Sequence, residues 1–114
     1  MHEAGIMEST LALAAAKARD QGATRIHRIV LRIGALSGVE PEALRFAFDA
    51  MAKQTPAAGA VLDIETVPAC GRCEECDLEF EVTSGFIFTC PKCGRISGDL
   101  NQGRELELAR LEIS

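Results

Sequence analysis

Apolar residues recur with helical spacing near the start of the chain, over residues 4–21. The apolar stripe consists of Met7, Leu11, Ala14 and Ala18. Ile6 and Leu13 extend this stripe on the adjoining face, and Gly22 is a natural stop at the C-terminal end. The pattern predicts an amphipathic helix whose stripe packs against the rest of the fold.

The spacing changes to strict alternation over residues 24–34, which predicts a strand. One face of this strand carries Ile29, Leu31 and Ile33, and the other carries Arg28, Val30 and Arg32. A loop over residues 34–38 leads to Pro41, which suits the first turn of a second helix. This helix is predicted to end near residue 53. Its buried stripe comprises Leu44, Ala47, Phe48 and Met51.

Alternating positions predict two further strands, over residues 61–67 and 104–113. In the last strand the apolar positions change from even to odd numbers. They are Leu106, Leu108, Leu111 and Ile113. A β-bulge near Ala109 or Arg110 explains this change of phase, because one extra residue shifts all later side chains to the opposite face.

This order of elements predicts an α+β fold, in which two helices pack on a three-stranded sheet. The intervening residues 69–100 interrupt the sheet and predict an inserted module. The chain therefore divides into an α+β domain, residues 1–68 and 101–114, and a smaller metal-binding module, residues 69–100. With 47% hydrophobic residues but no Trp and no Tyr, the core of this 114-residue chain must be mainly aliphatic.

The charge balance argues against a nucleic-acid partner. The formal net charge is −5, and no run of Lys or Arg provides the basic face that such a protein uses. No apolar stretch approaches the length of a transmembrane helix. We expect no signal peptide, because the N-terminus has no basic region followed by a continuous apolar segment. Paired cysteines without an export signal favour a reducing compartment, so we expect a cytoplasmic protein without membrane contact.

Four cysteines form two matched CxxC pairs, and this is the strongest chemical signal in the chain. They are Cys73, Cys76, Cys90 and Cys93. Two such pairs can surround one zinc ion with four thiolates, in a module of zinc-ribbon type. Asp77 and Gly94 follow the two pairs directly, and both residue types tolerate the positive φ that such turns require.

A third CxxC overlaps the first pair, because Cys70 lies three residues before Cys73. We expect Cys73 and Cys76 to be the ligands, since they lead directly into an alternating segment at Leu78. Cys70 is then a free thiol or an exchangeable ligand. Iron in the same four-sulfur shell would instead make a rubredoxin-like electron carrier.

The sequence argues against an enzyme. A zinc ion with four sulfur ligands has no open position for water or substrate, so its role is structural. The chain contains no GxSxG, P-loop or HExxH motif. His27, in the first strand, is expected to be an ordinary strand residue.

The opening Met1-His2-Glu3 permits a second metal site. The α-amino nitrogen, the amide of His2 and its imidazole can form fused chelate rings in one plane. Planar nitrogen ligands suit Ni(II) or Cu(II) better than Zn(II). Glu3 could complete or orient such a site.

The opening Met-His-Glu, residues 30–34 and the two CxxC pairs together resemble the HypA/HybF family of nickel metallochaperones in hydrogenase maturation. The resemblance implies that His2 is the essential ligand of transferable Ni(II), that Glu3 assists, and that Glu40 lies close by. It also implies that the four paired cysteines hold structural Zn(II).

The same resemblance implies which partners the chain has. They are a nickel-binding GTPase of HypB type and the large-subunit precursor of a nickel-iron hydrogenase, with urease maturation served by some relatives. A homodimer is possible. The alternative is a zinc-stabilised adaptor that binds other proteins and transfers no nickel.

Overall fold

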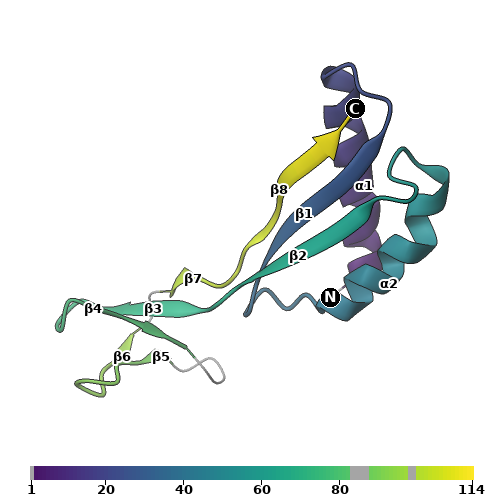
Figure 1. The fold of residues 1–114 in the computed structure, drawn as a ribbon. Helices are drawn as coiled ribbons and strands as arrows, with labels where there is room; N and C mark the ends of the chain where they lie inside the picture. The colour runs from purple at the N-terminus through teal and green to yellow at the C-terminus, as the bar shows by residue number, and fades with distance from the viewer. Residues whose placement is uncertain (1, 83–87, 98–99) are drawn as a thin grey trace.

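The computed structural model describes residues 2–82, 88–97 and 100–114 and confirms the predicted α+β fold. The main domain contains α1 (Glu3–Asp20), β1 (Ile26–Gly34), α2 (Pro41–Met51), the 3-10 helix η1 (Ala52–Gln54), β2 (Val61–Val67) and β8 (Leu106–Ile113). Its sheet has the order β2-β1-β8, with β1 parallel to β2 and antiparallel to β8. Both helices lie on one side of this sheet (Figure 1).

The core lies between the two helices and the inner face of the sheet. The predicted stripe of α1 is buried throughout, as are Ile29, Leu31 and Ile33 of β1. Leu44 and Phe48 of α2 belong to the same cluster, which confirms the predicted faces of both helices. The aliphatic character of the core follows from the composition, because Phe48 is the only aromatic residue of this cluster among the described residues.

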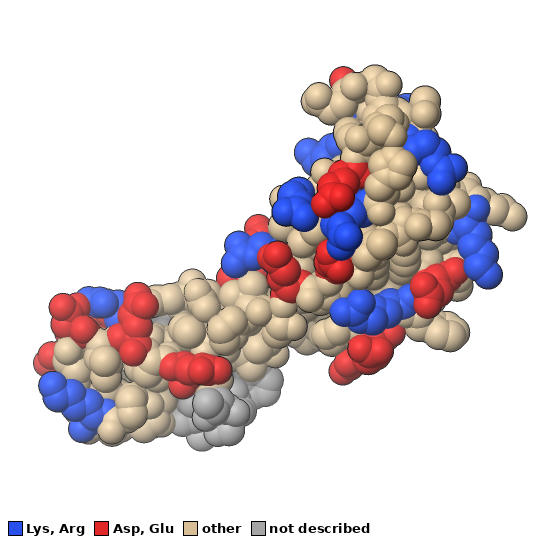
Figure 2. Space-filling model, in the orientation of Figure 1, with Lys and Arg blue, Asp and Glu red and all other residues tan. Residues whose placement is uncertain are grey.

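The outer face of the sheet carries ion pairs that cross all three strands. Arg28 of β1 contacts Asp63 on β2 and Glu112 on β8. Arg32 lies four residues further along β1. Its Nε is 4.0 Å from Oε2 of Glu65, and its Nη1 is 3.4 Å from Oε1 of Glu107. Val30 lies between the two arginines and is only 4% exposed. Each exposed pair contributes little alone, but together they make this face polar (Figure 2).

A β-bulge in β8 confirms the phase change read from the sequence. Val30 lies opposite Arg110, whereas the next residue of β1, Leu31, lies opposite Leu108. Ala109 is therefore the extra residue. The bulge keeps Leu108 and Leu111 on the side of the helices despite their odd spacing.

Some predicted details are wrong. Leu13 is 47% exposed, because α1 does not cover the edge strand β8 completely. The predicted end of the second helix near residue 53 is close, because α2 ends at Met51 and one 3-10 turn continues it to Gln54. β1 begins at Ile26, since the N–H groups of Thr24 and Arg25 both bond the carbonyl of Ser114 instead of a strand partner.

The inserted module forms two small sheets. One has the order β4-β3-β7 and contains β3 (Cys70–Cys73), β4 (Leu78–Glu81) and β7 (Leu100–Gln102). The other pairs β5 (Phe88–Thr89) with β6 (Ile96–Ser97). The module projects from the main domain and gives a molecule of 54 × 25 × 17 Å (Figure 1). The exact division between domain and module stays a prediction.

Main-chain contacts join the module to the domain, at a place we call the joint, formed by Gly34, Ala69 and Gly103. A Cβ atom on Gly34 would lie 2.1 Å from the carbonyl of Gly103, and one on Gly103 would lie 2.6 Å from the Cα of Ala69. Gly103 also has φ of 124°. Hydrogen bonds from Leu36 to Gly103 and from Gly34 to Glu105 connect these strands. Only glycine permits this approach.

Candidate metal sites

The four paired cysteines converge at the end of the module. Their sulfur atoms all lie within 4.8 Å of one another, and the Sγ atoms of Cys73 and Cys93 are 3.7 Å apart. Ligands about 2.3 Å from a tetrahedral zinc ion are about 3.8 Å from each other. The group therefore has the donor type, the number of donors and the approximate size that zinc requires.

Local backbone geometry brings the sulfurs together. Cys73 ends β3, and Cys76 lies in the turn that follows, which closes at Asp77 with φ of 50°. Cys90 follows β5, and its carbonyl accepts a hydrogen bond of 2.9 Å from the N–H of Gly94, where φ is 75°. Both positive φ values were predicted from the sequence, and they turn each CxxC loop back on itself.

The surroundings favour the thiolate form of Cys90 in particular. Main-chain N–H groups of Cys93 and Lys92 point at the sulfur of Cys90 and lower its pKa to about 7. The neighbouring sulfur of Cys93 and partial burial raise the pKa of Cys76 to about 12. Cys73 and Cys90 are almost fully buried. A metal cation would stabilise such closely spaced sulfurs, because it displaces their protons and its positive charge offsets the repulsion between the thiolates.

Cys70 lies outside this group. It starts β3, where its cross-strand neighbours are Glu81 and Gln102. It lies three positions before Cys73, an odd number, so the two side chains leave the strand on opposite faces. The structure thus brings together the four cysteines that the sequence favoured and leaves the fifth aside.

The N-terminal residues lie at the other candidate site. His2 is exposed and precedes the first turn of α1. Glu3 accepts a hydrogen bond of 3.0 Å from the main-chain N–H of Glu40, the residue that precedes α2. This bond lowers the pKa of Glu3 below its usual range. The starts of the two helices are therefore held together directly beside His2.

The predicted place of the Glu40 carboxylate close to the nickel site stays a prediction. The structure adds a contact that the sequence did not suggest, since the main-chain N–H of Glu40 donates a hydrogen bond to Glu3. His27 lies far along the sheet, where its Nε2 is 2.6 Å from the hydroxyl of Ser114. In the described part of the chain, Cys, His and acidic side chains form no second cluster of three or more.

Comparison with known proteins identifies the family. The family model described as "Hydrogenase/urease nickel incorporation, metallochaperone, hypA" matches residues 1–113. The chain is 46% identical over 112 residues to hydrogenase maturation factor HypA of Chloroflexus aurantiacus, with 98% of each chain covered. It is 48% identical over 113 residues to HypA of a Picosynechococcus strain, with 99% of each chain covered.

A solved structure agrees with this result. The solution structure of the nickel metallochaperone HypA from Helicobacter pylori superposes with a TM-score of 0.70 at 28% identity. The match covers 99% of this chain and 97% of the other. The family consists of metallochaperones and not of enzymes, in agreement with the carrier predicted here. The resemblance noted in the sequence is confirmed, and this chain belongs to the HypA family of hydrogenase maturation metallochaperones.

Proposed function

We propose that the protein carries Ni(II) at His2 and delivers it for assembly of the nickel-iron hydrogenase active site. The observation that carries this proposal is the exposed His2 at the start of α1, fixed in place by the Glu3–Glu40 hydrogen bond. Membership of a family described by nickel incorporation supports the choice of cargo.

The position of His2 suits a metal that must be passed on. An exposed imidazole can be reached by the ligands of an acceptor protein, whereas a buried one cannot. Nitrogen donors from the imidazole and the adjacent main chain fit Ni(II). Glu3 would orient the site through its bond to α2, and a direct contribution from the carboxylate of Glu40 would add an oxygen ligand.

The four cysteines would hold Zn(II) permanently. Four thiolates fill the coordination shell of zinc and leave no position for nickel chemistry. The ion would fold the module, whose strands are only two to four residues long in the described chain and enclose little core. Binding energies of structural zinc, about 10–16 kcal/mol in small peptides, are sufficient for this.

Partners follow from the same proposal. Nickel would be loaded from, or together with, a nickel-binding GTPase of HypB type, and delivered to the hydrogenase large-subunit precursor in the cytoplasm. Among the helices of the described chain, none has the length and hydrophobicity needed to cross a membrane.

Calorimetric titration of untagged, zinc-loaded protein with Ni(II) tests the nickel site. We expect stoichiometric binding by the wild type and by His27→Ala, and none by His2→Ala, with the zinc content unchanged in all three. His27→Ala is the matched control, because it removes the only other histidine of the chain.

Equal nickel binding by His2→Ala and the wild type, or no binding by either, would contradict the proposal. The chain would then be better described as a zinc-stabilised adaptor that acts in hydrogenase maturation without carrying nickel itself.

A further inference from the structure

An elongated pocket of about 480 Å³ begins at His2 and follows one side of α1. His2 and Leu13 both line it, so it extends along three turns of the helix, or about 16 Å at the helical rise per residue. Leu106, the first residue of β8, lines it from the side of the sheet. The pocket therefore opens directly beside the proposed nickel ligand.

The walls of this pocket are mainly apolar. Ile6 is partly buried, and Leu13 and Leu106 are 47% and 45% exposed. The hydroxyl of Thr10 is turned toward the helix, because it donates a hydrogen bond of 2.8 Å to the carbonyl of Ile6. Gly5 leaves open space, since a Cβ atom there would meet no other atom within 4 Å. Covering these walls with an apolar group would be favourable.

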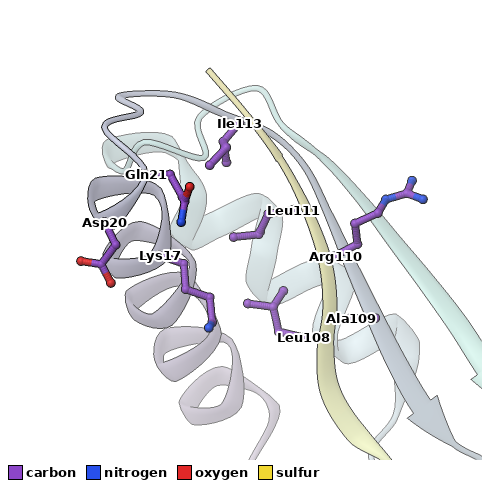
Figure 3. A pocket seen from close by; sticks show the side chains of 8 residues that line it. All are labelled: Lys17, Asp20, Gln21, Leu108, Ala109, Arg110, Leu111 and Ile113. Atoms are coloured by element: carbon purple, nitrogen blue, oxygen red, sulfur yellow. The ribbon is translucent and has the colours of Figure 1, made fainter.

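The lack of charge in this pocket restricts what can occupy it. Apart from His2, the described residues that line it are uncharged. The pocket at the other end of α1 differs, because Lys17, Asp20 and Arg110 are among the residues that line it (Figure 3). A charged group would lose its hydration beside His2 without gaining a charged partner from the walls. We therefore expect a neutral, apolar occupant in the pocket beside His2.

Nickel at His2 would also have a position for a ligand from another molecule. The α-amino nitrogen, the amide of His2 and its imidazole supply three donors in one plane, and planar coordination has a fourth position. An oxygen ligand, from water or from Glu40, could fill this position and be displaced by an incoming nitrogen. Imidazole suits Ni(II), and its neutral form matches the uncharged walls of the pocket.

We propose that the pocket receives an extended segment of the protein with which this chain exchanges nickel, and that this segment carries a histidine flanked by aliphatic residues. This inference rests on nickel binding at His2. The incoming neutral imidazole would donate a lone pair to Ni(II) as the oxygen ligand leaves, and nickel would keep its oxidation state.

The dimensions of an extended chain fit this arrangement. Residues two and four positions from the histidine lie on the same face as its imidazole, and they extend about 13 Å from it. Aliphatic side chains at these positions would contact Ile6, Leu13 and Leu106, while the histidine reaches nickel at the start of the helix. The intervening side chains would face solvent.

Two matched peptides provide the test. The probe is Leu-Lys-Leu-Ser-His-Ser-Leu-Lys-Leu, acetylated and amidated, and in the control peptide serine replaces every leucine. In calorimetry with nickel- and zinc-loaded wild type, we expect the leucine peptide to bind at least tenfold more tightly than the serine peptide. Removal of nickel alone should weaken binding of the leucine peptide at least tenfold, because its imidazole then has no metal to bind.

Variants of the walls locate the binding site. Leu13→Asp places a charge in the pocket, and Gly5→Leu fills its open space. Both variants should bind nickel like the wild type, but their preference for the leucine peptide should fall below threefold. The matched control is Phe46→Asp, because Phe46 is 78% exposed on α2 and does not line the pocket. It should keep the tenfold preference. Circular dichroism establishes that every variant is folded.

The outcomes separate this proposal from the nickel function itself. Equal affinity of the two peptides for nickel-loaded wild type would overturn the proposal and leave nickel binding at His2 intact. A preference retained by both Leu13→Asp and Gly5→Leu would also overturn it, since the peptide would then bind elsewhere. A wild type that binds no nickel would contradict the proposed function and this inference together.

Discussion

The carboxylate of Glu3 connects two helices through a single main-chain hydrogen bond. Its acceptor oxygen belongs to the first turn of α1 and the donor N–H precedes α2, so each helix start fixes the position of the other. A negative charge is favourable at this place, because both helix dipoles present their positive ends to it.

The lowered pKa of Glu3 predicts how this bond depends on pH. A carboxylate whose pKa is lower in the folded than in the unfolded state stabilises the fold above the unfolded value, and this contribution disappears as the pH falls through the folded value. In NMR titrations of Glu40→Gln, whose own side chain carries no carboxyl, the amide of residue 40 should therefore shift with a midpoint below the usual glutamate pKa. The shift should be absent when Glu3→Gln is added, because no carboxyl is then left at either position. An identical titration in both proteins would show that Glu3 is not its cause.

The close approach at the joint predicts a large effect of a single methyl group. Gly34→Ala would force a Cβ atom to within 2.1 Å of the carbonyl of Gly103, and neither backbone can move aside easily. We expect a loss of about 3 kcal/mol or more in the free energy of unfolding, measured by urea denaturation.

Gly5→Ala is the control for that measurement. Gly5 lies in α1, and its added methyl group would meet no atom within 4 Å. Alanine is the better helix former, so this variant should be neutral or more stable by up to about 1 kcal/mol. Equal stability of both variants would contradict the steric account of the joint.

At the scale of whole elements, the bulge of β8 decides which side chains reach the core. Deletion of Ala109 alone would remove the extra residue and leave Leu111 and Ile113 on the inner face of a regular strand. Deletion of Ala109 together with Arg110 would instead turn Leu111 and Ile113 toward the polar face of the sheet. For the double deletion we expect a loss of about 3 kcal/mol or more in the free energy of unfolding, from two partly buried aliphatic side chains, and for the single deletion a much smaller loss. A double deletion as stable as the wild type would exclude this role.

The elements that sequence periodicity predicted well are the long ones. Both helices and the strands β1, β2 and β8 repeat their apolar pattern often enough to be recognised. The bulge of β8 was also predictable, because the apolar positions change there from even to odd numbers. The exposure of Leu13 could not be foreseen, because helical spacing does not tell whether the neighbouring strand lies at the edge of the sheet. The strands β5, β6 and β7 have two or three residues each, too few to show alternation.

The candidate sites were predictable to different degrees. CxxC spacing reduced the candidates to five cysteines, and the alternating segment from Leu78 favoured the four that the structure brings together. The hydrogen bond between Glu3 and Glu40 could not be predicted from spacing. Every residue except proline has a main-chain N–H, and only the tertiary fold decides which of these groups donates to the Glu3 carboxylate.

At the scale of the whole molecule, the main domain and the module are stabilised by different interactions. The main domain has an aliphatic core, and the module has short strands around four cysteines. In Cys73→Ser we therefore expect loss of bound zinc and of slow amide exchange in β3 and β4, while the amides of α1 and β1 keep their protection. Hydrogen exchange followed by NMR measures both parts in one sample.

Cys70→Ser is the matched variant, on the same strand and three residues away. Because its sulfur lies outside the cluster, zinc content and protection in the module should stay at the wild-type level. Loss of zinc in this variant as well would mean that Cys70 takes part in the ligand shell.

The joint also determines how the module can move. Because Gly34, Ala69 and Gly103 meet where the module leaves the main domain of a molecule that is 54 Å long, the module acts as a lever arm with its pivot at these three residues. A rotation of a few degrees at the pivot displaces the outer tip of the module much more than any atom of the joint. Steric contact between main-chain atoms limits that rotation. The distance over which the tip of the module can move therefore depends on glycine at positions 34 and 103.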